Sequence, residues 1–199
     1  MAQSQISANL IYGGLQDNGV IRYNGTGWQK VIGGDGTTCS FKPDDENILL
    51  LSNDTRGVNR YTVSTSSSVS VMDYLGNIPN GYDDRTAFCS PVAVAPSDNT
   101  RWYVGSDNIH VSSNGGSTFS GNGTPPGATY IENLHKPAIA IGVSYSNKDK
   151  LYVSVSPFSQ NLNTDGLYYT PPATIRKSTN GGGLFSTVSS TLPDRIVTD

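Results

Sequence analysis

The sequence has little of what several large classes of protein require. Its 199 residues carry 13 lysines and arginines against 16 acidic residues, a formal net charge of −3 with no block of basic residues. A surface that follows the phosphates of a nucleic acid needs such a block, so nucleic acid is not an expected partner. A neutral or sugar-like ligand fits this charge better.

Long apolar runs are also missing from the chain. No stretch approaches the roughly 20 apolar residues that a membrane-spanning helix needs, so no membrane span is expected. Residues Met1 to Leu10 lack the charged and apolar regions of a signal peptide. We therefore expect either that an export signal has been removed or that the protein stays inside the cell.

Two cysteines and two histidines leave little material for a metal or redox site. They lack the spacing of zinc ligands, so no metal site is predicted. Cys39 lies in the inward register of a predicted strand and Cys89 is one position out of that phase, which disfavours a disulfide. Calcium stays open at Asp17 or at Asp83 and Asp84, although no twelve-residue calcium loop is present.

The composition that remains favours strands over helices. Apolar residues make up 35% of the chain, and 22 glycines and 11 prolines interrupt it throughout. A chain of this length can bury a sizeable core, roughly 70% of its unfolded surface. Together these numbers predict an all-β fold with many turns.

Three stretches of the sequence repeat at a spacing of about fifty residues. In each, a turn residue stands seven positions before a short apolar run; the three pairs are Pro43 and Leu50, Pro96 and Tyr103, and Tyr145 and Tyr152. The preceding residues alternate as in a half-buried strand, which predicts burial of five side chains: Phe41, Val92, Val94, Ile141 and Val143. Repeats of forty to fifty residues with several strands and no helix are typical of propeller blades.

The predicted fold is therefore a partial β-propeller of about three to four blades, each with four antiparallel strands. Within one propeller domain, 1–199, the expected units are a half blade at 8–31, blades at 37–87, 88–136 and 137–191, and the start of another blade at 192–199. The two ends could complete one blade and close a ring of four, or the chain could be a piece of a longer propeller. We expect the piece, whose exposed blade edges would favour self-association.

One motif in the chain resembles a known family motif. Residues Ser112 to Phe119, with Asn114, Gly116 and Thr118 between them, resemble the Asp-box, Ser-x-Asp-x-Gly-x-Thr-Trp. A weaker copy carries Ser178, Asn180, Gly182 and Phe185. In this motif the polar side chain caps a hairpin and the aromatic residue packs beneath it, so we expect a structural role.

The resemblance extends over nearly the whole chain. Asp-box propellers, also called BNR-repeat proteins, occur in sialidases, xyloglucan-cleaving hydrolases and sortilin-like receptors. The segments Tyr12 to Gly19 and Gly33 to Gly36 also look like a pair found in large secreted bacterial repeat proteins. This likeness implies a propeller and a secreted or cell-surface location, and it does not imply one reaction.

Two kinds of enzyme can be weighed against the sequence. Sialidase chemistry needs arginines clustered on a carboxylate, whereas Arg22, Arg60, Arg176 and His110 are predicted to repeat at one strand position, as structural residues do. Hydrolysis like that of a xyloglucanase needs two carboxylates about 6.5 to 9.5 Å apart, for which Asp17 and Asp35 are the candidates. A family xyloglucanase divides its acids between two tandem propellers, and only one partial propeller is visible here.

The loops expected beside Asp17 and Asp35 suggest a ligand-binding face. Tyrosine rings stack on sugars, and amides and carboxylates bond hydroxyl groups. The residues assigned to this face are Gln16, Asp17, Asp35, Tyr82, Tyr130, Glu132 and Tyr168. The alternative is that the tyrosines pack their own loops. We expect a non-catalytic segment that binds a glycan or a protein in adhesion or as a scaffold, with a fragment of an Asp-box glycoside hydrolase as the alternative.

Overall fold

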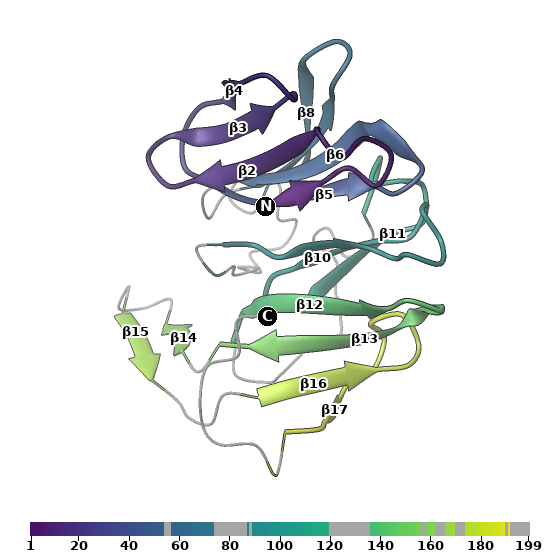
Figure 1. The fold of residues 1–199 in the computed structure, drawn as a ribbon. Helices are drawn as coiled ribbons and strands as arrows, with labels where there is room; N and C mark the ends of the chain where they lie inside the picture. The colour runs from purple at the N-terminus through teal and green to yellow at the C-terminus, as the bar shows by residue number, and fades with distance from the viewer. Residues whose placement is uncertain are drawn as a thin grey trace.

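The computed structural model describes most of the chain as strands joined by turns (Figure 1). It describes residues 1–53, 57–73, 87, 89–119, 136–156, 158–161, 166–169, 174–189 and 191. Within these residues the backbone forms antiparallel β-sheets and no helix, and therefore none that could cross a membrane. The predicted all-β fold is confirmed.

The first sheet has four strands in the order β1-β2-β3-β4. They are β1 (Ala2–Gln3), β2 (Ile11–Leu15), β3 (Gly19–Tyr23) and β4 (Trp28–Ile32). The sequence predicted only a half blade at 8–31, so the first strand of this sheet was not expected. Ala2 pairs with Tyr12 and Gln3 with Ile11, so a short β1 occupies the place of the first strand.

The second and third sheets follow the same antiparallel plan. The second has the order β5-β6-β7-β8. Its strands are β5 (Gly36–Lys42), β6 (Asp45–Asn53), β7 (Gly57–Thr62) and β8 (Ser67–Asp73). The third sheet, as far as the described residues go, has three strands: β9 (Val92–Val94), β10 (Trp102–Gly105) and β11 (Ile109–Ser112).

The fourth sheet again contains four strands, in the order β12-β13-β16-β17. They are β12 (Ala138–Ser144), β13 (Asn147–Val155), β16 (Thr174–Ser178) and β17 (Ser186–Thr187). Between β13 and β16 the chain forms a separate hairpin of β14 (Phe158–Asn161) and β15 (Gly166–Tyr169). In Figure 1 the first and second sheets overlap at the top, the third sheet crosses the middle and the fourth lies at the bottom.

Apolar side chains fill the space between each pair of neighbouring sheets. Tyr12 of the first sheet packs with Leu49 and Leu51 of the second. On the other face of the second sheet, Leu50 packs with Trp102 of the third. Tyr103, Leu151 and Val153 belong to the core between the third and fourth sheets. Alternation along β6 and β10 thus supplies the second and third sheets with two apolar faces each.

The five side chains predicted to be buried are only partly so. Phe41 is buried in the core between the first and second sheets, as expected. The other four are half-buried: Val92, Val94, Ile141 and Val143. Val92 and Val94 on β9 pack against the margin of the core between the second and third sheets, and Ile141 and Val143 on β12 pack against that between the third and fourth.

The basic residues of the third strands do not share one position, as the sequence had suggested. Arg22 pairs with Tyr12 and Arg60 with Leu50, which puts both on the face toward the following sheet. His110 pairs with Val104 and Arg176 with Val153, one residue out of that register. Because neighbouring residues in a strand point to opposite faces, the four side chains form two sets.

Two glycines allow the backbones of the first and second sheets to approach each other closely. A Cβ atom on Gly14 would lie 2.1 Å from the carbonyl oxygen of Thr37, and one on Gly36 would lie 2.0 Å from that of Gly19. Real Cβ atoms do not approach backbone so closely, so each position requires glycine. This contact holds the turn between β2 and β3 against the start of β5.

Candidate functional site

The predicted acid pair, Asp17 and Asp35, lies where that contact brings two turns together. Asp17 stands between β2 and β3 with a positive φ of 62°, and Asp35 stands between β4 and β5. The backbone amide of Asp17 donates a hydrogen bond of 2.5 Å to Oδ1 of Asp35. Asp35 therefore holds the neighbouring turn in place, while the Asp17 side chain and Gln16 are exposed.

The rest of the predicted ligand face falls largely outside the described residues. Tyr82, Tyr130 and Glu132 lie there, as does the alternative calcium position at Asp83 and Asp84. Tyr168 belongs to β15, whose backbone alone is described. Among the described residues no group of three or more histidine, cysteine, aspartate or glutamate side chains is placed to hold a metal ion.

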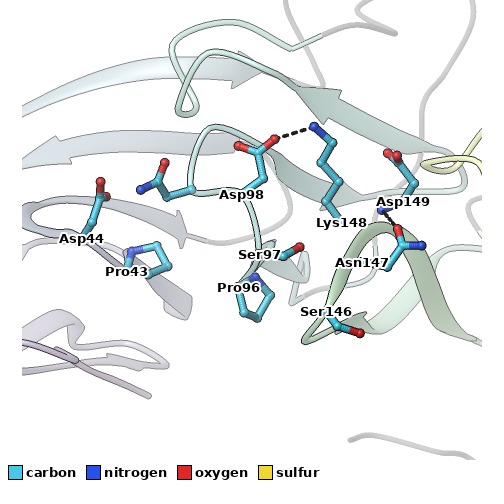
Figure 2. Close-up of a pocket in the computed structure, with 10 residues that line it drawn as sticks. Pro43, Asp44, Pro96, Ser97, Asp98, Ser146, Asn147, Lys148 and Asp149 are labelled. Carbon is cyan, nitrogen blue, oxygen red and sulfur yellow. Dashed lines mark hydrogen bonds and ion pairs between the residues drawn. The ribbon is translucent and has the colours of Figure 1, made fainter.

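A groove that the sequence did not predict lies at the opposite ends of the strands. It is formed by the turns that join the first and second strands of the second, third and fourth sheets, which we call the first turns (Figure 2). Its volume is about 660 Å³. The lining residues are Pro43, Asp44, Pro96, Ser97, Asp98, Asn99, Ser146, Asn147, Lys148 and Asp149.

The three first turns are built by the same local hydrogen bond. Asp45, Asp98 and Asn147 each accept, through Oδ1, the backbone amide two residues later, at 3.1, 3.0 and 2.9 Å. Side-chain bonds of this kind are the reason that Asp and Asn favour turns. The sequence signal for these turns was present in the repeated Pro43 and Pro96, but it indicated turns and not a groove.

Ion pairs engage the carboxylates of the groove. Lys148 Nζ lies 2.6 Å from Asp98 Oδ2 and links the third and fourth sheets. This bond, with those from Thr100, lowers the pKa of Asp98 to about 2. Asp149 Oδ1 lies 3.6 Å from Arg101 Nη2, and Asp44 Oδ1 lies 2.7 Å from Lys42 Nζ. The groove therefore offers anions already paired with cations, together with amides and hydroxyl groups.

The two Asp-box-like segments form one hydrogen-bond network twice. Ser112 Oγ accepts the amide of Gly116 at 3.0 Å, and Asn114 Oδ1 accepts that of Thr118 at 3.0 Å. In the second copy Ser178 Oγ accepts the amide of Gly182 at 2.9 Å, and Asn180 Oδ1 accepts that of Leu184 at 2.9 Å. Gly115, Gly116, Gly181 and Gly182 have φ between 69° and 91°, a conformation that favours glycine.

These two segments are also hydrogen-bonded to two of the first turns that form the groove. The amide of Gly115 donates to the carbonyl of Thr100 at 3.0 Å, and the amide of Gly181 donates to that of Asp149 at 2.8 Å. Each Asp-box-like turn is thereby fixed to the first turn of its own sheet. Phe119 is buried between the second and third sheets, and Phe185 packs against the core between the third and fourth.

A buried polar cluster between β10 and β11 was also missed. Ser106 Oγ lies 3.1 Å from His110 Nε2, and Asn108 Nδ2 donates to Asp107 Oδ1 at 3.0 Å. A serine beside a histidine is the start of a nucleophilic site. Here Ser106 and Asp107 are fully buried and His110 is 1% exposed, so substrate in solvent does not reach them. Asp107 and Asn108 occupy the same turn between second and third strands as Asp17 and Asn18 do in the first sheet. Nothing in the neighbouring sequence indicates that they are buried.

Both cysteines are free. Cys39 is buried against the first sheet, and Cys89 is exposed. Burial raises the pKa of the Cys39 thiol to about 11 and raises that of Cys89 as well. A thiol with a raised pKa is a weak nucleophile at neutral pH, so neither residue has the environment of a catalytic cysteine.

Comparison with known proteins identifies the fold and no family. No family model and no curated protein matches the sequence. Among solved structures, the chain is similar to the GH74 xyloglucanase from Xanthomonas campestris with a TM-score of 0.61 and 15% identity. That match covers 96% of this chain and 30% of the xyloglucanase chain. A GH74 enzyme from Niastella koreensis matches with a TM-score of 0.46 and 13% identity, over 92% and 44% of the two chains. The chain is therefore a partial β-propeller that spans under a third of the first of these proteins.

Proposed function

We propose that this chain is a non-catalytic β-propeller segment that binds a glycan or a protein surface through the groove formed by its first turns. The observation that carries the proposal is the groove itself, a polar hollow of about 660 Å³ lined by three consecutive turns. Ligand sites commonly have volumes of ~300 to 1,000 Å³ and a few placed polar groups. The amides and hydroxyl groups of Asn99, Ser146 and Asn147 are suited to the hydroxyl groups of a polysaccharide.

A tyrosine beside the groove supports a carbohydrate ligand. Tyr145 precedes the lining residue Ser146 and is 85% exposed. It occupies the position that Pro43 and Pro96 occupy in the other two repeats. An exposed tyrosine ring offers a flat apolar face to a sugar, and proline rings add smaller faces. Together, the rings of Pro43, Pro96 and Tyr145 would contact successive sugars of an extended polysaccharide that crosses the three turns.

The charges of the groove argue against acid catalysis there. A glycosidase needs one carboxylic acid whose pKa is raised, so that it can protonate the leaving oxygen. The pKa of Asp98 is instead lowered to about 2, chiefly by Lys148. Asp44 and Asp149 also lie beside cations. Asp98 therefore remains anionic at neutral pH and can accept hydrogen bonds from hydroxyl groups.

The experiment is binding to a panel of polysaccharides, measured by affinity electrophoresis. Tyr145→Ala and Asn99→Ala should each weaken binding about tenfold or more with an unchanged melting temperature. Asp17→Asn, Asp35→Asn and Tyr130→Ala are the matched variants of the face predicted from the sequence. If only the second group weakens binding, the ligand site belongs on that face. The proposal fails if no polysaccharide binds and if neither set of variants weakens binding of a protein partner.

The second candidate function is that of a glycoside hydrolase fragment. It is favoured by the fold similarity to a xyloglucanase and by the contact between Asp17 and Asp35. Release of reducing ends from xyloglucan and soluble glucans tests it. Activity that falls about 10²-fold or more in both Asp17→Asn and Asp35→Asn would establish catalysis and overturn the non-catalytic proposal.

The proposal extends to the family and the location of the protein. The paired serine and asparagine networks at Ser112 and Ser178 support membership among Asp-box propellers. Proteins of that kind are often secreted or displayed at the cell surface, which suits adhesion. Calcium at Asp17 stays a prediction, and a shift of the melting temperature on adding calcium that is lost in Asp17→Asn would support it.

A further inference from the structure

Several asparagines of the chain are each followed directly by glycine, a pair that can react with itself. Glycine has no side chain to shield its backbone nitrogen, so this nitrogen can attack the side-chain carbonyl carbon of the preceding asparagine. Within the described residues these asparagines are Asn18, Asn24, Asn114 and Asn180; the pairs at 80–81 and 122–123 lie outside them. The structure separates the four by what each glycine nitrogen already bonds.

The glycine nitrogens of the two Asp-box-like turns are occupied. The amide of Gly115 donates to the carbonyl of Thr100 at 3.0 Å, and that of Gly181 donates to the carbonyl of Asp149 at 2.8 Å. Such a nitrogen has to leave its acceptor before it can reach a side chain. The asparagine side chains of both turns are fixed as well, by bonds with their serines and with later backbone amides. Both pairs are therefore protected in the folded chain.

Asn18 is constrained by the contact between the first two sheets. Gly19 begins β3 and pairs with Leu15. A Cβ atom on Gly36 would lie 2.0 Å from the Gly19 carbonyl oxygen, so the backbone at Gly19 has little room to move. The Asn18 side chain donates from Nδ2 to the carbonyl of Gln16 at 3.3 Å, which turns it away from Gly19. Ring closure at this pair works against both contacts.

Asn24, in the turn between β3 and β4, has the opposite properties. It is exposed, and its Oδ1 accepts three hydrogen bonds: from the amides of Thr26 and Gly27 at 3.1 and 3.2 Å and from Thr26 Oγ1 at 2.8 Å. Among the described residues the amide of Gly25 forms no hydrogen bond. The Asn24 side chain is thus folded over Gly25 and held there, with its carbonyl carbon beside an unoccupied nitrogen. Such preorganisation favours an intramolecular reaction.

The same three donors stabilise the charge that the reaction creates. When the Gly25 nitrogen bonds to Cγ of Asn24, negative charge develops on Oδ1. Hydrogen bonds to an anionic oxygen are stronger than those to a neutral amide, so donors already in place lower the barrier. The aspartate product also fits the turn. Asp98 Oδ1 accepts the amide and the hydroxyl of Thr100 at 3.0 and 2.6 Å, the same pair of bonds that Asn24 accepts from Thr26.

We propose that Asn24 is a site of spontaneous deamidation, in which Gly25 supplies the nucleophile and the Thr26 hydroxyl stabilises the intermediate. Solvent base removes the Gly25 amide proton, the bond from this nitrogen to Cγ forms, and the bond from Cγ to Nδ2 breaks with release of ammonia. Water then opens the cyclic imide at either carbonyl, which leaves aspartate or isoaspartate at position 24. Both products add one negative charge, and isoaspartate also lengthens the main chain of the turn.

The test is peptide mapping by mass spectrometry after incubation in mildly alkaline buffer, which separates asparagine, aspartate and isoaspartate at each position. In the folded chain Asn24 should convert about tenfold or more faster than Asn114 and Asn180. In concentrated urea, where the turns are lost, the three positions should convert at similar rates. Asn24→Gln should abolish the reaction at position 24, because its longer side chain would have to close a larger ring.

Two variants of Thr26 test the role of the hydroxyl. Thr26→Val removes it and should slow conversion of Asn24 by about threefold, whereas Thr26→Ser keeps it and should leave the rate unchanged. Equal rates at Asn24, Asn114 and Asn180 in the folded chain, or a difference that persists in urea, would overturn the proposal. A rate that Thr26→Val leaves unchanged or raises would also overturn it. Circular dichroism and melting of each variant show whether the fold is retained.

Discussion

The two Asp-box-like turns allow a prediction in which the number of hydrogen bonds sets the loss of stability. The Asn114 side chain makes three: it accepts from the Thr118 amide at 3.0 Å and from Ser112 Oγ at 2.8 Å, and it donates to Thr118 Oγ1 at 2.8 Å. The site is exposed, so each bond contributes about 0.5 kcal/mol, the low end for protein hydrogen bonds. Asn114→Ala should therefore lower the free energy of unfolding by about 1.5 kcal/mol.

The second copy supplies the matched control. Asn180 makes two such bonds, to the Leu184 amide and to Ser178 Oγ, both at 2.9 Å, because Leu184 stands where the first copy has Thr118. Asn180→Ala should lower the free energy of unfolding by about 1 kcal/mol. Leu184→Thr should raise it by about 0.5 kcal/mol, and only while Asn180 is present. Leu184 is 69% exposed, so its removal costs little packing.

Urea unfolding and thermal melting measure these differences. For a chain of this size 1 kcal/mol corresponds to about 2 to 4 °C, so Asn114→Ala should melt about 3 to 6 °C lower. Phe119→Ala, which empties a buried site, should cost about 3 to 5 kcal/mol. A loss for Asn180→Ala equal to or above that for Asn114→Ala would refute the reasoning. Unchanged melting with lost ligand binding would instead assign these residues to the binding site.

Three further predictions concern single side chains. Tyr103→Phe should lower the free energy of unfolding by about 1 to 2 kcal/mol in urea, because it removes the bond to the Lys148 carbonyl. Tyr12→Phe should lower it by under about 0.5 kcal/mol, because among the described residues the buried Tyr12 hydroxyl makes no hydrogen bond of normal geometry; equal losses would contradict this. The lowered pKa of Asp98 means that its stabilising contribution is complete above the unfolded pKa near 4 and is lost as the pH falls through about 2. Urea midpoints between pH 5 and pH 2 should therefore fall less steeply in Asp98→Asn than in the unaltered chain, and parallel curves would exclude this role. A thiol reagent should label the exposed Cys89 in the native protein and Cys39 only on unfolding; rapid native labelling of Cys89→Ser would oppose the burial of Cys39.

The repeats predicted the strands well because alternation along a strand is a local property. The second strands at Leu50, Tyr103 and Leu151 lie as expected, since each supplies apolar residues to both faces. The two-residue β1 was missed because Ala2 and Gln3 carry no such pattern. Arg22 and Arg60 do share one position, but His110 and Arg176 lie one residue out of that register, because a basic residue in a strand does not by itself indicate which face it points to.

The candidate sites were less predictable, for a physical reason. Turns at Asp45, Asp98 and Asn147 follow from side-chain bonds to nearby amides, and these are encoded locally. The groove arises only when three sheets stack and bring their turns side by side, which depends on the packing between sheets. The same dependence separates Asp17 from Asp107: similar turn residues lie exposed in the first sheet and fully buried in the third.

The three separate cores make the molecule behave as a linear array. Among the residues that the structure describes, the second and third sheets each contribute to two cores, whereas the first and fourth contribute to one. In such an array the free energy of each unit is its own plus that of its nearest neighbours, so the end units open before the middle ones. Amide exchange should accordingly be slowest in β6 and β10 and faster in β3 and β16. Local opening would start at both ends of the stack and move inward, and the chain would lose its order one sheet at a time.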